Sequence, residues 1–516
     1  MSNALQPRVT GNIVGANVAV SNTPQKVLFV GQMVAAGSAT GGNLYENIQD
    51  NSEDTLFGAA SQLAGMIRAA RKLNPVTRFD AIPLDDNGSG VAATGTIAFT
   101  GTITTAGTIS ITIGSELDYT FDLAVSVGDT ATVIGDALVA AITANLDTPF
   151  TASNTTGTVT ITAANDGTLG NFIGLVYDLG DSVGVTCALT AMASGATDPT
   201  LTGVFDVVGN NRYQGIVWPY FADTSEVRSF LDARFNVTNE VLDGVAITSS
   251  VDTLANHLTR LNALNSQSLV DICDETTNET AFKGPAQMEL SYIKAAQFTA
   301  IRAYRLTADA SISQFVITTN GPLDSIGGPA LASKPYFNTP MPDLPLYATG
   351  RGFTDTEIEQ LHDAGGTVIG NNSAGNTVVM GEVVTTYKTD TAGNADISFK
   401  YLNYVDTISN VREYYVNNYR TRFAQSRLTE GDIIAGRDMA NALVIQAYSE
   451  QLYQDLSGPN FVLLQAGENA LVFYKENFSV VLDLATGKAT IQMVVPLVTQ
   501  LREITATIKI SFSTSA

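Results

Sequence analysis

The sequence predicts a multidomain protein of the α/β plus β class. We expect a mainly parallel α/β host sheet, an inserted β-rich module, and a C-terminal α+β domain that ends in an exchangeable strand. Between Arg78 and Arg212 there is no lysine, arginine or histidine, although 14 of the chain's 50 carboxylates lie there. On both sides of that window, short apolar runs alternate with helical patterns, which is typical of βαβ units. With 516 residues, the chain is long enough to bury several cores.

The N-terminal stretch and the first host elements differ in their apolar patterns. Residues 1–25 alternate only loosely and are interrupted by glycines, so we expect an extended arm there. The apolar run at 26–31 is short and continuous, which predicts a buried strand. Residues 55–71 have helical spacing and close with Arg68 and Arg71, cations that suit the C-terminal end of a helix dipole. A strand at 79–84 and a turn at 85–90 complete this part.

The window without cations predicts an inserted, self-contained module at 88–202. Threonine or serine alternates with isoleucine or phenylalanine at 98–113 and again near 155–163, a pattern of half-buried antiparallel strands. Between them, residues 130–145 predict one helix. We expect its inward face to carry Val133, Leu138 and Ile142. Because this module is acidic, we expect it to face solvent, to bind neither nucleic acid nor an anionic membrane, and to repel other copies.

The host pattern resumes after the module and then gives way to a helical and β-meander region. Strands alternating with helices of this length imply a mainly parallel sheet. The expected host elements are strands at 213–220, 244–247 and 268–272, and helices at 224–234, 251–264 and 286–306. They are followed by an irregular stretch at 320–346, α/β pieces at 354–400, helices at 406–424 and 430–456, and strands at 477–484, 489–497 and 502–512.

These elements divide the chain into five expected parts. They are an N-terminal extended arm at 1–25, the α/β host domain at 26–87 and 203–346, the outward-facing module at 88–202, a C-terminal α+β domain at 347–500, and a C-terminal arm strand at 501–516.

Composition excludes several classes of protein and site. No apolar run approaches the roughly 18 residues that cross a bilayer, and the first residues have no apolar signal core, so we expect no membrane span and no export by that route. Cys187 and Cys273 fall in different parts, which fits a reducing compartment. With only His257 and His362, a histidine-rich metal site is excluded, and we expect both on the surface or as helix caps.

No recognisable catalytic or cofactor motif stands at a strand-to-helix junction. The sequence at 85–88 resembles half a calcium loop but lacks the downstream glutamate, so we interpret it as the turn into the module. Acidic pairs of the kind glycosidases use are expected by chance in so acidic a chain. We therefore expect no enzyme activity, no cofactor and no metal.

Two kinds of interaction residue stand out instead. The first is a basic strip near 400–437, which includes Lys400. It is interpreted either as solvated helix faces with intrachain partners or as a surface for an acidic protein. Its members are Arg412, Arg420, Arg422, Arg427 and Arg437. The second is the two chain ends, where a final strand either completes its own sheet or is donated to a neighbouring copy. The residues expected in these arms are Val18, Val20, Ile504, Ile508, Ile510 and Phe512.

Together these segments resemble the contractile tail sheath proteins of bacteriophages, with the Mu-like branch the most similar. The similarity spans nearly the full chain. Each motif is weak alone, and the resemblance rests on the order in which the motifs occur. The motifs lie at 27–32, 56–66 and 81–85, then at 101–109, 128–131 and 167–171 in the module, and finally at 349–354, 363–367 and 385–387.

The resemblance implies a structural, non-enzymatic subunit of the virion tail, assembled in the host cytoplasm. Copies would polymerise helically around an inner tail tube protein, exchange terminal strands with their neighbours, and contract to drive the tube through the host envelope. The extended sheath would be metastable. Further implied partners are the baseplate and tail terminator proteins, with residues near 400–456 facing the tube. Two alternatives stay open: a baseplate or capsid-decoration protein whose β-domain binds a host surface, and a tail-associated glycan hydrolase.

Overall fold

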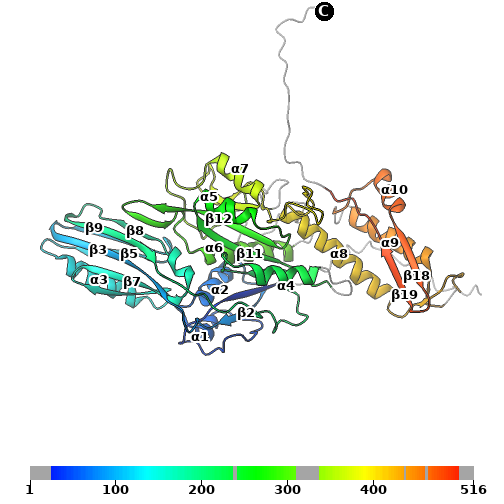
Figure 1. Cartoon of the computed structure of the whole chain (residues 1–516), viewed down its shortest axis with the longest axis horizontal. Coiled ribbons are helices and arrows are strands. Elements are labelled where there is room, and N and C mark those ends of the chain that lie inside the picture. Colours follow the sequence, from blue (N-terminus) through cyan, green and yellow to red (C-terminus); the bar gives the residue numbers. More distant parts are fainter. Residues whose placement is uncertain are drawn as a thin grey trace, which may run out of the picture.

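The computed structural model describes residues 25–235, 241–308, 336, 338–434, 437–458 and 463–498. The arms predicted at the two ends therefore lie almost wholly outside the described residues. The molecule is elongated and has three parts (Figure 1). The module lies at one end, the α/β sheet at the centre, and a group of helices with a β-hairpin at the other end.

A parallel sheet forms the centre, and it confirms the βαβ arrangement that alternating strands and helices predicted. Residues of β1 pair in parallel with strands on both sides. The strand order is β2 (Arg78–Leu84), β1 (Lys26–Gln32), β10 (Gly215–Val217), β11 (Val245–Asp252), β12 (Leu269–Asn278) and β14 (Gly366–Asn371), with β15 (Thr377–Met380) antiparallel at the edge.

Helices cover both faces of this sheet, which explains why its strands are continuously apolar. Val27 and Phe29 of β1 pack with α2 (Gln62–Leu73) and α6 (Ser291–Ala308). Leu28 and Val30 point the other way, into the cluster that contains α4 (Ser225–Phe235). Beside α4, helices α5 (Leu254–Asn262) and α7 (Asp355–Ala364) pack together against β12 and β14. The result is an α/β/α sandwich.

The helix predicted at 55–71 is two helices. The first, α1 (Glu53–Phe57), ends at Gly58, whose φ of +83° is a left-handed value that favours glycine. The second, α2, begins after Ser61, whose side-chain oxygen accepts a hydrogen bond from the backbone N–H of Ala64 at 3.1 Å. The apolar spacing continues through the break, which is why the pattern alone did not reveal it.

The module consists of a four-stranded antiparallel sheet, three antiparallel strands that continue the central sheet, one α-helix and one short 3₁₀ helix. Helix α3 (Ala131–Ala144) confirms the predicted helix, but its buried stripe is Ile134, Leu138 and Ile142. Val133, expected inward, is 50% exposed, because the stripe repeats every four residues from Ile134 and leaves Val133 beside it. The module strands are β3 (Ala92–Thr105), β4 (Gly107–Ile113), β5 (Thr120–Val125), β6 (Phe150–Thr155), β7 (Thr158–Asp166), β8 (Leu175–Asp178) and β9 (Val183–Ala193).

The sequence predicted a self-contained module, but the module shares its core with the host. Strand β8 pairs antiparallel with β13 (Phe282–Pro285), and β13 pairs with the far end of β12, so one mixed sheet of 11 strands runs from host to module. Apolar residues of both parts also belong to one contiguous buried cluster. Pairing between short strands more than 100 residues apart leaves no local signature in the sequence, so the insertion looked independent.

The C-terminal lobe, defined as residues 402–498, confirms a helical region followed by a hairpin. The helix predicted from 430 begins only at Asn441, whose side chain caps it. The expected domain boundary at 347 does not end the central sheet, since β14 and β15 lie beyond it. The lobe contains α8 (Leu402–Phe423), β16 (Arg427–Leu428), β17 (Met439–Ala440), α9 (Ala442–Ser457), α10 (Glu468–Glu476), β18 (Ser479–Asp483) and β19 (Lys488–Gln492).

Candidate assembly surfaces

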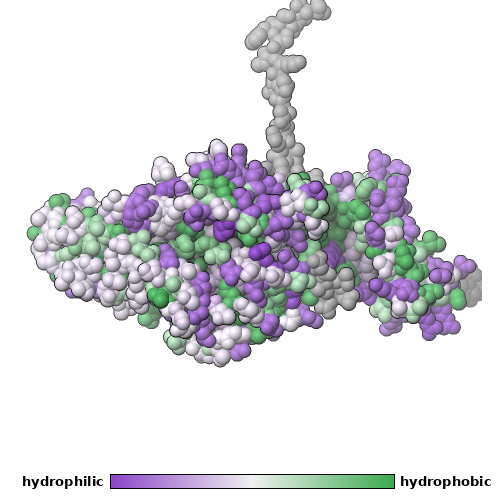
Figure 2. Space-filling model, viewed as in Figure 1, coloured by the Kyte–Doolittle hydropathy of each residue, from purple (hydrophilic) through white to green (hydrophobic). Residues whose placement is uncertain are grey.

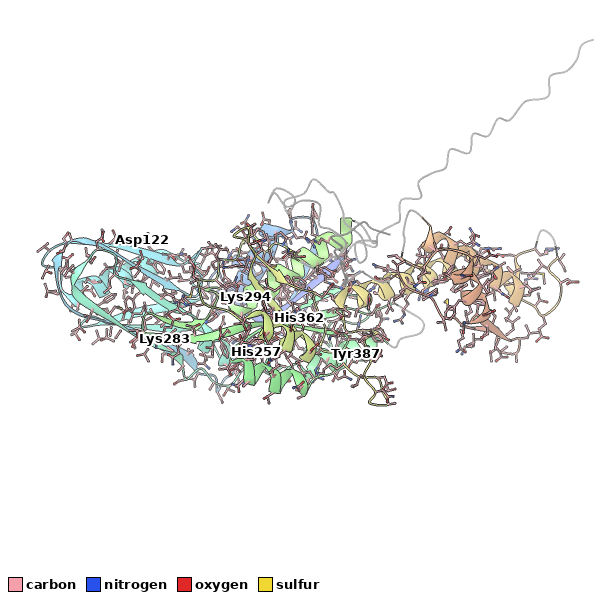
Figure 3. The ribbon with its side chains drawn as sticks, turned by 90° about the horizontal axis from the view of Figure 1, so that it is seen from above. Asp122, His257, Lys283, Lys294, His362 and Tyr387 are labelled. Atoms are coloured by element: carbon pink, nitrogen blue, oxygen red, sulfur yellow. The ribbon has the colours of Figure 1, made fainter. Side chains whose placement is uncertain are left out.

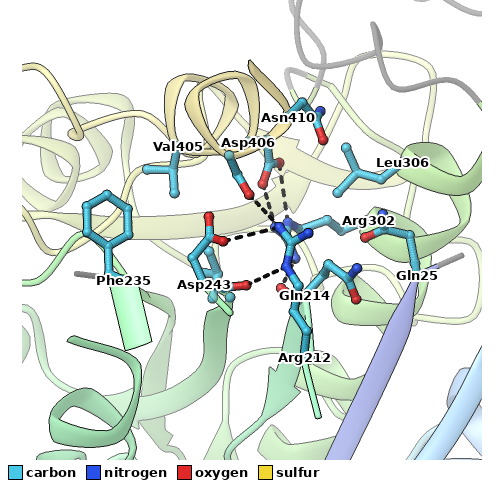
Figure 4. A pocket seen from close by; sticks show the side chains of 13 residues that line it. Gln25, Arg212, Gln214, Phe235, Asp243, Arg302, Leu306, Val405, Asp406 and Asn410 are labelled. Atoms are coloured by element: carbon cyan, nitrogen blue, oxygen red, sulfur yellow. Dashed lines mark hydrogen bonds and ion pairs between the residues drawn. The ribbon is translucent and has the colours of Figure 1, made fainter. Parts of the chain in front are cut away.

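A buried ion pair fixes the first turns of α8 to the central sheet. Arg302 of α6 pairs with Asp406 of α8, and their side chains are 4% and 2% exposed. The guanidinium also donates to the carbonyl oxygen of Gln214 at 2.7 Å, and the Tyr336 hydroxyl donates to Asp406 at 2.5 Å. Figure 4 shows Arg302, Gln214 and Asp406 close together. Since each charge is buried, removing one partner would leave the other without compensation.

A second set of contacts continues this joint one to two turns further along α8. The Arg212 guanidinium donates to Glu413 at 2.7 Å and to the Ser409 hydroxyl at 2.7 Å, and it lies 3.3 Å from the buried carboxylate of Asp243. Arg412 donates to the carbonyl oxygen of Phe235 at the end of α4 at 2.5 Å. The first half of α8 is therefore rigidly attached to the host sheet.

The basic strip predicted from sequence is divided between two places. Arg412 lies at the joint just described, whereas Arg422 lies about 15 Å further along α8, at 1.5 Å per residue. Around the end of that helix, Arg422 faces Asp438 at 3.7 Å, with both side chains about half exposed. The exposed residues Arg420, Arg427 and Arg437 lie in the same end region of α8, β16 and the turn before β17. Lys400 pairs with Asp363 at 3.2 Å, away from them.

The second half of α8 presents an apolar groove. Its aromatic side chains Tyr415 and Tyr419 pack with Tyr448 and Tyr474 of α9 and α10 in a separate small core. Beside that core lies a cavity of about 360 Å³. It is lined by Ile408, Val411, Arg412, Tyr415, Val416, Tyr419, Met493, Val495 and Leu497. The chain passes along this groove to Val498, the last described residue before the predicted C-terminal arm.

The hairpin β18–β19 has open edges and exposed strands. The two strands pair with each other from Ser479 to Gln492, and among the described residues neither pairs with a third strand. Every residue of β18 and β19 is at least partly exposed, and Val481 is 66% exposed. Figure 2 shows apolar side chains in green on this lobe, next to strongly polar ones. Two open strand edges with apolar side chains are a ready template for a further strand.

The predicted donors of such strands cannot be placed. Val18 and Val20 on one side, and Ile504, Ile508, Ile510 and Phe512 on the other, all lie outside the described residues. Strand exchange therefore stays a prediction, while the hairpin β18–β19 is part of the described structure.

We had expected His257 on the surface or as a helix cap, but it lies on the buried face of α5 and is 0% exposed. It is labelled in Figure 3. Its Nε2 lies 2.9 Å from the carbonyl oxygen of Asp274, and Arg260 approaches Nδ1 at 3.0 Å. Burial lowers the pKa of His257 below its ordinary value. A sequence signal existed, because His257 precedes buried Leu261 by four residues and thus shares its helix face.

The group around His257 is a buried hydrogen-bonded cluster. The Oγ of Ser250 lies 3.3 Å from His257 Nδ1, and its hydroxyl donates to Asp271 at 2.9 Å. Arg260 pairs with the same Asp271 at 2.6 Å. A nucleophile needs access to substrate as well as a base. Ser250 and His257 are both 0% exposed.

The remaining candidates for chemistry are also held in buried or paired environments. His362 lies in the last turn of α7, where burial lowers its pKa to about 4. Lys294 forms a buried ion pair with Asp274. Among the described residues, no three metal-binding side chains gather into a site. Within the same residues, no helix combines the length and apolarity needed to span a bilayer.

Comparison with known proteins finds a relative that is a tail sheath protein. The chain is 31% identical over 237 residues to the Mu-like prophage FluMu tail sheath protein of Haemophilus influenzae. That match covers 44% of this chain and 48% of the relative, so it spans about half of the relative's length. No model of a protein family matches the chain. The resemblance to tail sheath proteins that the ordered motifs indicated is thereby confirmed.

Among solved structures, the chain is similar to the sheath tail protein from Desulfitobacterium hafniense, with a TM-score of 0.44, 9% identity, and coverage of 96% of this chain and 99% of that one. It is also similar to the anti-feeding prophage helical sheath in the contracted state, with a TM-score of 0.41, 10% identity, and coverage of 96% and 94%. A chain of the anti-feeding prophage baseplate in the contracted state is similar as well, with a TM-score of 0.44 and 11% identity. That match covers 99% of this chain and 100% of the other.

Proposed function

We propose that this chain is the sheath subunit of a contractile phage tail. Copies polymerise helically around an inner tail tube and contract to drive the tube through the host envelope. The observation that carries this proposal is the hairpin β18–β19, a two-stranded sheet with both edges open among the described residues. An isolated hairpin is marginally stable in water, so it gains most from strands supplied by another copy.

The two chain ends supply these strands in the proposed polymer. The C-terminal arm at 501–516 follows Leu497, which lines the apolar groove, and Val498, the last described residue, while the N-terminal arm at 1–25 precedes β1 in the sequence. Each copy gives its arms to neighbours and accepts theirs. Every contact is then between unlike surfaces, and repetition of such contacts produces an open helical filament when the rotation does not close.

The rigid attachment of α8 supports this assembly. The buried pair of Arg302 with Asp406 and the contacts of Arg212 hold the lobe against the central sheet. A subunit that moves as one body transmits its displacement to neighbours through the exchanged strands. Contraction then draws its free energy from newly buried interfaces and needs no nucleotide, and the extended state is held by a kinetic barrier.

The three parts of the molecule take different radial positions in this proposal. The module at 88–202, which has no cation, faces outward, where its charge discourages tubes from sticking together. The lobe faces the tube, with Arg420, Arg422, Arg427 and Arg437 toward an acidic tube surface. Baseplate and terminator proteins bind the two ends of the polymer in the virion tail, after assembly in the host cytoplasm.

Electron microscopy of the purified full-length chain tests the proposal. We expect long hollow cylinders at micromolar concentration. Discrete rings or monomers at every concentration would contradict it, and rings would favour a baseplate or decoration protein instead.

A further inference from the structure

A lysine and an aspartate are buried in contact between the central sheet and α6. Lys294 lies in the first turn of α6 and Asp274 lies in β12, and both side chains are 1% exposed. The Nζ of Lys294 donates a hydrogen bond to Asp274 Oδ2. Lys294 is labelled in the central part of the molecule in Figure 3. The pair belongs to none of the assembly surfaces described above.

The other lysine–carboxylate pairs among the described residues are open to water. The more exposed side chain of each such pair is 43% to 83% exposed. These pairs are Lys72 with Asp343, Lys400 with Asp363, and Lys475 with Glu450. Water is excluded from the pair of Lys294 and Asp274, so an amine and a carboxyl group are held in contact there in a fixed orientation. Holding two groups in this way greatly favours a reaction between them.

The Lys294 ammonium lacks an acceptor for one of its three protons. Among the described residues, Nζ finds two acceptors, which are Asp274 Oδ2 and the carbonyl oxygen of Gln287 at 3.2 Å. A buried ammonium with an unused donor is costly. Transfer of that proton's charge to Asp274 replaces two buried charges by a neutral amine and a neutral acid, which an apolar interior tolerates better. A neutral amine has a free electron pair and is a nucleophile.

A tyrosine holds the second oxygen of Asp274. Tyr347 is 7% exposed, and its hydroxyl donates to Asp274 Oδ1 at 2.9 Å. Burial raises the pKa of Tyr347, so the hydroxyl keeps its proton and remains a donor. A fixed donor at this oxygen stabilises the negative charge that the oxygen acquires when the carboxyl carbon is attacked.

We propose that Lys294 and Asp274 join in an amide cross-link between α6 and β12. The Nζ atom of the neutral amine attacks Asp274 Cγ, and the C–N bond forms while the electron pair of the C=Oδ1 bond moves to Oδ1. When that electron pair returns, the bond from Cγ to Oδ2 breaks. Oδ2 leaves as water with two protons, the one received at the start and a second from the nitrogen. The reaction therefore needs no oxidant, nucleotide or other reactant.

The cross-link closes a covalent ring that contains β13, the strand through which the module joins the host. The ring runs from residue 274 to residue 294, and its residues Phe282 and Lys283 pair with β8 of the module. Helix α6 also carries Arg302, whose ion pair holds α8. Force that passes between the module and the lobe therefore crosses a covalent bond at this point. The inference does not depend on the proposed function.

Mass spectrometry of the denatured full-length chain tests the cross-link. We expect the wild type to be lighter, by one water molecule, than its sequence requires. Lys294→Arg should have its full mass, because a guanidinium keeps the charge but is not a nucleophile at neutral pH. The matched control is Lys475→Arg, which changes an exposed lysine in the same way and should keep the lighter mass. Comparison among these chains cancels any processing of the chain ends.

Digestion with trypsin locates the bond. We expect residues 261–283 joined to residues 284–302, because an amide at Lys294 blocks cleavage after it. A wild-type chain at full mass, with 261–283 and 284–294 as separate peptides, would overturn the cross-link and show an ordinary ion pair. A lighter chain in which these peptides are not joined would overturn it as well. If Lys294→Arg does not fold, the wild-type digest alone decides.

Tyr347→Phe tests the step at Oδ1. In chains sampled at intervals after synthesis, the lighter form should appear roughly a hundredfold more slowly than in the wild type. Tyr387→Phe is the matched control, since it also removes a hydroxyl that donates to an aspartate, Asp396 at 2.6 Å, and it should keep the wild-type rate. A purely structural role of Tyr347 would change stability but not this rate, and equal rates would contradict the proposed step. Because the mass is read on denatured chains, polymerisation does not affect the result, and electron microscopy judges the sheath proposal separately.

Discussion

The central sheet and the C-terminal hairpin differ in how far their strands are buried and in whether their edges are paired. In β1, Val27 to Val30 are 0% exposed, and each has helices or other strands over it. In β18–β19, no residue is fully buried, and both outer edges are open among the described residues. Among the described residues, the central sheet is covered by its own chain, whereas the hairpin is not. The difference indicates where the proposed exchange of strands can be tested.

The strongest way to break this comparison is to remove the proposed donor strand. Deleting 501–516 should leave a folded monomer that no longer polymerises, because the central sheet keeps all its contacts while the hairpin loses its partner. Circular dichroism, sedimentation and electron microscopy report the two properties separately. Deleting only 513–516 is the matched control, since it keeps Ile504 to Phe512, and it should polymerise. Unaltered polymers after the longer deletion would contradict strand donation.

The module offers a second comparison, because it extends the central sheet. Excising 88–202 with a short linker would expose the edge of β13 and the apolar residues Leu290 and Ile293, which now pack in the shared cluster. We therefore expect an aggregated product. A soluble product that still forms cylinders would show that the module is self-contained after all. Solubility after expression and electron microscopy provide the readout.

The joint between sheet and lobe can be tested by one substitution. Asp406→Asn leaves the buried Arg302 charge without its counterion, and we expect the free energy of unfolding to fall by about 3–5 kcal/mol. Asp438→Asn is the control, because its pair with Arg422 is about half exposed and should contribute at most about 1 kcal/mol. Urea unfolding of dilute monomer measures both. Equal effects would mean that the joint does not hold the lobe.

A smaller effect is expected from pH at the module–host boundary. Glu289 is buried, accepts hydrogen bonds from Ser115 and the backbone of Leu290, and its burial raises the pKa of its carboxyl to about 8. The folded protein therefore holds this proton to higher pH than the unfolded chain, whose carboxyl titrates near 4.5. Stability should fall between pH 4.5 and 8, by at most about 1.4 kcal/mol per pH unit.

Glu289→Gln should flatten that dependence, because an amide neither titrates nor carries charge. The control is Glu116→Gln on the neighbouring exposed loop, which should keep the wild-type slope. Urea unfolding at pH 5 and pH 8 is sufficient. An unchanged slope in Glu289→Gln would assign the pH dependence to other groups.

Much of the fold could be predicted because local sequence patterns determine it. The buried strands β1 and β2, the helix α3 and the order of βαβ units all follow from short apolar runs and helical spacing. The break between α1 and α2 could not be predicted, since it depends on the φ of Gly58 and not on apolar spacing. The pairing of β8 with β13 is set by contacts across more than 100 residues, which periodicity does not record.

Of the candidate surfaces too, only the features with a local sequence pattern could be predicted. The two strands of the hairpin were predicted at 477–484 and 489–497. The partners of Arg412 and Arg422 were not, because ion pairs between separate elements depend on how helices dock.

The most direct test of the account is a structure of the assembled full-length chain by electron cryomicroscopy, traced through the C-terminal lobe. The account predicts strands from neighbouring copies hydrogen-bonded to the open edges of β18 and β19. A polymer in which those edges remain unpaired, or in which each chain's own ends fold back onto its own hairpin, would contradict it.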